Sequence, residues 1–162
     1  MNLPPPLIES SETFGAALLW GFEAAAAQGA RVITCADPDF EGWPLDDPAL
    51  LQGLSDWIRL PQRQLVLLAA SYDGVPRRLP RFAAWRRNWS HAIQALKAPA
   101  EFAPDLPTLL IDDVLVSVYL VDRLQWRGLA AADGRKRWLL QEKLDVVLQR
   151  SEPGFPISTL GL

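Results

Sequence analysis

Asp37 and Asp39 form the first pattern in this sequence that could do chemistry, because they directly follow an apolar run of strand length. The carboxyl end of a strand in an α/β sheet often holds Mg²⁺, since hard cations prefer carboxylate oxygens. A metal-dependent phosphatase or a glycosyltransferase would use such a D-x-D pair, but no further motif of either class follows. A solvated loop before a helix capped by Asp47 accounts for the same acids. We favour that loop and expect no metal and no other cofactor.

A basic and aromatic segment follows between residues 77 and 91. Guanidinium groups match phosphate oxygens, and indole rings stack on bases or on cations, so this segment could bind a phosphate-bearing ligand or a nucleic acid. The pI of about 5.1 argues against nucleic acid, whose sites usually lie in basic domains. A solvated face, or an intramolecular partner for acidic residues, is the simpler interpretation. The candidate ligand-binding residues are Arg77, Arg78, Arg81, Arg86, Arg87 and Trp85.

The chain contains one histidine, His91, and one cysteine, Cys35. A catalytic base at His91 would need a carboxylate to orient it and a nucleophile beside it, so a structural role on a helix is the simpler expectation. Cys35 lies in an apolar run and should be a packed, inert thiol. Neither GxxxxGK[ST] nor GxGxxG occurs in the sequence, which excludes nucleotide binding by those loops.

Charge is unevenly distributed along the chain, although the net charge is only −3. Residues 1–58 hold nine acids against one base, for −8, and residues 59–97 hold eight bases against one acid, for +7. Residues 98–162 hold nine acids against seven bases, for −2. Such an acid–base–acid pattern fits self-association through opposite patches, binding of an anionic ligand, or two solvated faces of one globule.

The hydrophobic pattern predicts alternating helices and strands. Apolar residues make up 49% of the chain and charged residues 22%, which is typical of a globular domain, and no apolar run is long enough to cross a membrane. Helices are expected at 12–28, 47–60, 77–97 and 135–150, strands at 31–36, 64–70 and between Pro99 and Pro104, and a hairpin from 109–111 to 114–121. This order indicates an α/β fold with a mixed sheet flanked by helices on both faces.

We expect three segments: a flexible Pro-rich arm at 1–10, one α/β domain at 11–152, and an apolar tail at 153–162. The tail should pack on the domain or on a partner. The start of the sequence lacks the basic and apolar blocks of a signal peptide, so the expected location is the cytoplasm, without membrane insertion.

Three segments, together with the order of elements, resemble the single-domain bacterial type of the phospholipase D-like family. They are Arg31 to Phe40, like the opening strand and loop of divergent members, Val75 to Arg87, like their Arg-rich helix, and Leu106 to Val114, like the strand that carries the catalytic motif. The resemblance spans nearly the whole chain, and it implies the fold of one phospholipase D-like domain.

Active members of that family carry H-x-K-x4-D, followed after six residues by G-S-x-N. The resemblance implies that the His attacks phosphorus, that the Lys and Asn hold phosphate oxygens, and that the Asp orients the His. Only Asp112 of this motif remains in the present chain. Asp105 and Pro107 stand at the His and Lys positions, and Tyr119, Leu120 and Asp122 stand at the Gly, Ser and Asn positions.

The resemblance therefore implies a non-catalytic domain, a pseudoenzyme acting as a homodimeric binding or scaffold module, because single-domain members pair through the face that bears the motif. Two alternatives stay open. One is a phosphodiesterase or phosphatase that uses His91 or the Asp37/Asp39 loop. The other is a binder of phosphate or nucleic acid through the arginine segment. Asp112 is the remaining catalytic candidate, and a protein partner stays open as well.

Overall fold

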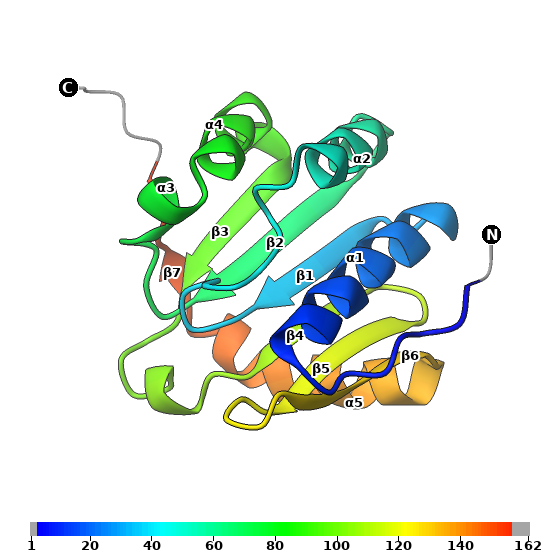
Figure 1. The fold of residues 1–162 in the computed structure, drawn as a ribbon. Coiled ribbons are helices and arrows are strands. Elements are labelled where there is room, and N and C mark those ends of the chain that lie inside the picture. Colours follow the sequence, from blue (N-terminus) through cyan, green and yellow to red (C-terminus); the bar gives the residue numbers. More distant parts are fainter. Residues whose placement is uncertain (1–2, 157–162) are drawn as a thin grey trace.

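A computed structural model describes residues 3–156 and contains one seven-stranded mixed sheet with helices on both faces (Figure 1). The strand order is β6-β5-β4-β1-β2-β3-β7. The strands are β1 (Val32–Ala36), β2 (Gln64–Ala69), β3 (Ile93–Lys97), β4 (Thr108–Asp112), β5 (Val116–Asp122), β6 (Arg127–Ala132) and β7 (Glu152–Pro153). The α/β class expected from the sequence is confirmed.

The sheet has a parallel half and an antiparallel half. Strands β1, β2 and β3 are parallel neighbours, whereas β4, β5 and β6 form an antiparallel meander that joins β1 through β4. Because β4 runs against β1, the start of β4 and the end of β5 lie at the same edge as the carboxyl ends of β1, β2 and β3. We call this the carboxyl edge of the sheet.

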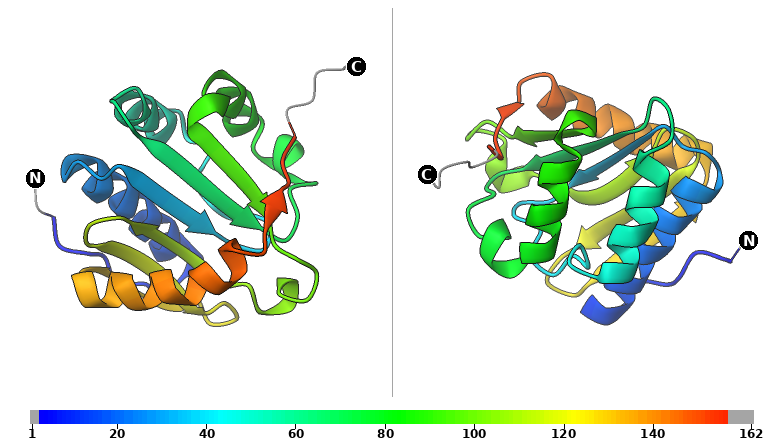
Figure 2. Two further views of the ribbon diagram at one scale, coloured as in Figure 1. Left: turned by 180° about the vertical axis from the view of Figure 1, so that it is seen from behind. Right: turned by 90° about the horizontal axis from the view of Figure 1, so that it is seen from above.

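Helices cover the two faces of the sheet unequally. Helices α1 (Ser11–Ala27), α2 (Pro48–Ile58), α3 (Val75–Arg78) and α4 (Pro80–Asn88) lie on one face, and α5 (Gly134–Leu148) crosses the other. Figure 2 shows the first group side by side in its right panel and α5 across the back of the sheet in its left panel. Each face has its own apolar cluster, so the sheet is buried on both sides.

Local signals in the sequence explain where the first two helices begin and end. The Ser10 side chain accepts a hydrogen bond from the Thr13 amide at the start of α1, and Gly29 adopts φ +73 just beyond its end. Asp47 caps α2 by accepting from the Ala49 amide. The apolar side of α1 faces the core, because residues at helical spacing are all buried, namely Phe14, Ala17, Leu18, Gly21, Phe22 and Ala25.

Two predictions about the middle of the chain are wrong. The expected helix at 77–97 is two short helices, α3 and α4, followed by a 3₁₀ turn at Ser90–Ala92 and then by strand β3. The segment between Pro99 and Pro104 is not a strand but a loop that enters the 3₁₀ turn Ala103–Asp105. Ile93 and Leu96 are buried, as a helical stripe would require, but their backbone pairs with β2.

Segments near the two ends of the described chain lie at the two margins of the sheet. Ile8 forms a bridge to Gly128 of β6, and β7 pairs with β3. Beyond β7, Phe155 is buried and stacks on Tyr72, with ring centroids 5.0 Å apart. The part of the predicted apolar tail from 157 to 162 lies outside the described residues. Over residues 3–156, no helix is both long and apolar enough to span a bilayer.

Candidate functional site at the carboxyl edge of the sheet

Asp37 leaves β1 at the carboxyl edge, and its carboxylate is buried and hydrogen bonded. One oxygen, Oδ2, accepts from the backbone amides of Asp39 at 3.1 Å and Phe40 at 2.7 Å, and the other, Oδ1, accepts from the Thr108 hydroxyl at 2.5 Å. Burial raises the pKa of Asp37 above its ordinary value of 3.8, while the hydrogen bonds and the charge of Arg123 act in the opposite direction. Asp37 thus holds the loop after β1 and the start of β4 together.

A hollow of about 500 Å³ opens beside Thr108 at the same edge, and we call it the edge hollow. Its lining combines the loop before β4, the start of β4, the end of β5 and one residue of α5. All five replaced positions of the phospholipase D-like motif line it, namely Asp105, Pro107, Tyr119, Leu120 and Asp122. Residues up to 17 positions apart in the chain therefore meet around one cavity, as the groups of a single phosphate site must.

Two cations also line the edge hollow, one on each side. Arg123 follows β5, donates from Nε to the Thr108 hydroxyl at 2.8 Å, and donates from Nη2 to the Leu106 carbonyl. Lys143 of α5 is exposed, and its Nζ lies 3.2 Å from the Tyr119 hydroxyl and 5.4 Å from the centre of that ring. The hollow therefore offers a fixed guanidinium and a solvated ammonium group to an anion.

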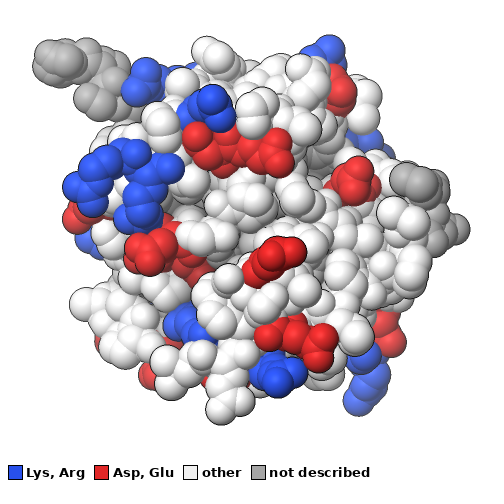
Figure 3. Space-filling model, viewed as in Figure 1, with Lys and Arg blue, Asp and Glu red and all other residues white. Residues whose placement is uncertain are grey.

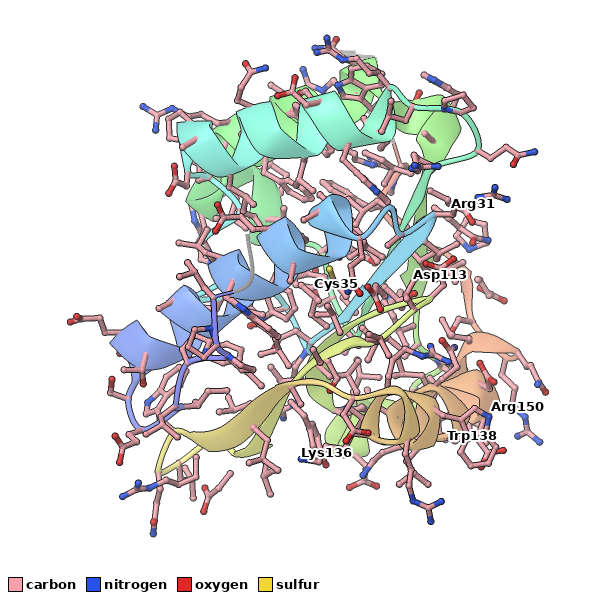
Figure 4. The ribbon with its side chains drawn as sticks, turned by 90° about the vertical axis from the view of Figure 1, so that its right-hand side faces the viewer. Arg31, Cys35, Asp113, Lys136, Trp138 and Arg150 are labelled. Atoms are coloured by element: carbon pink, nitrogen blue, oxygen red, sulfur yellow. The ribbon has the colours of Figure 1, made fainter. Side chains whose placement is uncertain are left out.

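Asp112, the one motif residue that remains, lies at the opposite edge of the sheet from the edge hollow. Its Oδ1 accepts from the amides of Val114, Leu115 and Val116 at 2.8–2.9 Å, and its Oδ2 accepts from the Gln28 side chain. These contacts cap the turn between β4 and β5. Next to it, Asp113 accepts from the Arg31 amide, and Figure 4 shows both residues at that end of β1. The geometry of Asp112 is that of a turn cap.

The arginine segment does not form one ligand-binding face. Arg78 donates to the Asp39 carbonyl at 2.7 Å, and Arg86 is buried with its guanidinium 4.1 Å from the centre of the Phe155 ring. Burial lowers the pKa of Arg86. Trp85 is buried as well and donates to the Ser55 hydroxyl at 2.7 Å, so its indole is unavailable for stacking on a base. The remaining three, Arg77, Arg81 and Arg87, are exposed.

The other candidate residues either lie far from the edge hollow or form hydrogen bonds within their own loop. His91 is exposed in the 3₁₀ turn before β3, which places it at the edge opposite the hollow and not on the expected helix. Asp39 accepts from the Glu41 amide. Within residues 3–156, no group of three or more His, Cys, Asp or Glu side chains is arranged to hold a metal ion. The Asp37/Asp39 loop is therefore a hydrogen-bonded turn in the described chain.

Sequence reasoning missed three residues of this site: Thr108, Arg123 and Lys143. They come from β4, the end of β5 and α5, and they belong to no motif. The only available signal was the resemblance itself, which placed Asp105 to Asp122 around one site. Arg123 follows the last motif position directly, so the same alignment marked it by proximity.

No family model matches the chain, no curated protein matches it, and no solved structure matches it.

Proposed function

We propose that this chain is a non-catalytic phospholipase D-like domain that acts as a homodimeric binding module, with the edge hollow as its ligand site. The observation that carries the proposal is the convergence of the five replaced motif positions on the edge hollow. An alignment made from the sequence alone names residues that turn out to be neighbours around one cavity. This convergence of five motif positions supports the resemblance, which no comparison tests, whereas the sixth position, Asp112, lies at the opposite edge of the sheet.

The chemistry of the edge hollow favours binding over turnover. Phosphoryl displacement by this family needs a His nucleophile and a Lys at the motif positions, where Asp105 and Pro107 stand. Among the residues that line the hollow there is no histidine and no cysteine. Lys143 and Arg123 can still hold an anionic group, but Asp105 and Asp122 line the same hollow and offset their charge, so we expect weak binding of an anion and no group that attacks it.

Hydrolysis of bis(p-nitrophenyl) phosphate tests the non-catalytic part of the proposal. Between about pH 5 and 9, with and without Mg²⁺, we expect no turnover above the buffer rate. Turnover that disappears in Asp37→Asn or His91→Ala would instead establish a phosphodiesterase. The oligomeric part is tested by light scattering, which should give about 36 kDa, twice the 18.0 kDa of the chain.

Phenyl phosphate is a suitable probe for the binding part, because it joins a phosphate to a small ring. In a titration followed by backbone NMR, we expect shifts confined to 105–108 and 119–123. Lys143→Met should weaken binding about tenfold or more, which corresponds to about 1.4 kcal/mol. Lys136→Met is the matched control, since Lys136 lies on the same helix but does not line the edge hollow. Equal loss in both variants, or shifts elsewhere, would contradict the proposed site.

A further inference from the structure

A second cavity, of about 430 Å³, lies between α1 and α2, on the face of the sheet that α5 does not cover. Its floor is apolar, with Leu19 and Trp20 on α1 and Leu50 and Leu54 on α2. Two acids, Glu23 and Asp47, are the charged residues in its lining, and no lysine or arginine takes part. We call it the acidic groove.

The same layer of helices carries the opposite charge at its other side. Helices α1, α2 and α4 lie next to one another in that order, as Figures 1 and 2 show. Arg77 on α3 and Arg81 and Arg87 on α4 are exposed, and none of them forms an ion pair within residues 3–156. Figure 3 shows basic groups gathered over the α3 and α4 side of this face, with acidic groups beside them. The guanidinium groups of the arginine stripe (Arg77, Arg81 and Arg87) thus form no ion pair within the described part of their own chain, although the Asp46 carboxylate accepts from the Arg81 backbone amide.

We propose that two copies of this chain pair through this helical layer, with the arginine stripe of each copy on the acidic groove of the other. This inference rests on the homodimer of the proposed function, but it places the interface on the helical layer and not on the motif-bearing face that the resemblance implies, so the edge hollow stays open to a ligand. A twofold axis that lies in the interface and runs along α2 reverses the order of the helices in the facing copy. The groove at α1 and α2 then meets the partner's α4, and the same contact is made twice, as an isologous interface requires.

Arginine suits a contact that is both apolar and acidic. Its hydrocarbon stem packs over apolar side chains while its guanidinium reaches a carboxylate, so one residue satisfies both the leucine floor and the acidic rim of the groove. The facing charges would also use the excess charge of residues 1–58 (−8) and residues 59–97 (+7), because within residues 3–156 the two segments share a single ion pair, Arg59 with Asp56. Because the contacts are partly solvated, added salt should weaken the dimer.

Charge reversal tests the interface. Glu23→Arg places like charges in the groove, and Arg81→Glu places like charges on the stripe, so each variant alone should lose at least tenfold in dimer affinity. An equimolar mixture of the two should recover a heterodimer, because the two introduced side chains then face each other with opposite charges and the second contact is wild type. Sedimentation velocity, with one of the two chains labelled, measures dimer formation by each single variant and by their mixture. Glu142→Arg and Arg135→Glu on α5 are matched controls, since both residues are exposed on the opposite face.

The outcomes separate this inference from the proposed function. Loss in the two single variants, recovery in the mixture and unchanged controls support pairing through the helical layer. A dimer that persists in Glu23→Arg and Arg81→Glu overturns this interface while the homodimer stands. A wild-type chain that stays monomeric at all concentrations overturns the interface and the homodimer together. Circular dichroism of each variant confirms that a loss of dimer is not a loss of fold.

Discussion

The hydroxyl of Thr108 donates to Oδ1 of Asp37 across 2.5 Å and accepts from Nε of Arg123 at 2.8 Å. One side chain therefore links the end of β1, the start of β4 and the residue after β5. Asp37 and Thr108 are both buried, so their polar atoms depend on these partners instead of water. Thr108 and Arg123 line the edge hollow, whereas Asp37 lies behind them and does not.

Thr108→Val should lower the free energy of unfolding by about 1–3 kcal/mol, because it keeps the shape of the side chain but leaves Asp37 Oδ1 and Arg123 Nε without a partner. Urea unfolding measures the loss. Arg123→Met should cost less when Thr108 is already valine than in the wild type, since the two residues share one hydrogen bond. Strictly additive losses in the double variant would contradict this link.

Asp112 should make stability depend on pH in a direction opposite to that of a salt-bridged acid. Burial raises the pKa of Asp112 above the ordinary 3.8, so the folded chain binds this proton more tightly than the unfolded chain does. The free energy of unfolding contributed by Asp112 is therefore highest below pH 3.8 and falls as pH rises through the raised pKa. Asp112→Asn cannot ionise and should gain stability relative to the wild type as the pH rises above 3.8 through the raised pKa. Parallel pH profiles for the two proteins would refute the raised pKa.

Phe155 should anchor the segment after β7, because its ring is stacked on Tyr72 and covered by the guanidinium of Arg86. Phe155→Ala should lower the free energy of unfolding by about 3 kcal/mol, through lost burial and a cavity beside a buried arginine. Phe155→Leu is the control that keeps apolar volume without the stack, and it should lose less. Removal of residues 153–162 with no change in stability would show that this segment does not contribute.

Cys35 should be unreactive in the folded protein. Figure 4 shows Cys35 on the side of β1 that α1 covers. Its side chain has 0% exposure, and burial raises the pKa of the thiol. Both effects suppress the thiolate that attacks alkylating reagents. Iodoacetamide at about pH 8 should label Cys35 at least a hundredfold more slowly in buffer than in concentrated urea. Fast labelling of the native chain would mean that β1 opens readily.

The elements that the sequence predicted well are those determined by nearby residues. Helix α1 has a capping serine, an apolar stripe at helical spacing and a glycine at its end, all within about twenty residues. The wrong predictions concern segments whose secondary structure depends on contacts with residues far away in the sequence. Residues 93–97 alternate only weakly and become a strand because β2 pairs with them. Strand β6 was not expected at all, since Gly128 and its alanines favour no strand locally and pair only because β5 is beside them.

The candidate site divides in the same way. Its acidic positions could be named from the sequence, because the resemblance assigns them by order along the chain. The roles of Asp37 and Asp112 could not, since both were judged by residue type as metal or catalytic candidates and both serve backbone amides. Lys143 lies on α5, 24 residues after Tyr119 in the sequence. The two side chains meet beside the edge hollow only because α5 crosses this face of the sheet.

Each margin of the sheet is partly covered by a very short segment. Ile8 bridges to Gly128 of β6, and the two residues of β7 pair with β3. A protease that removed either stretch would leave Gly128 of β6, or Leu96 and Lys97 of β3, without their backbone partners and so lengthen the unpaired margin on which neighbouring molecules could pair. Trimmed material should thus be prone to filament-like aggregation. Since β7 follows β3 by more than fifty residues, a nascent chain would pass through the same vulnerable state during translation.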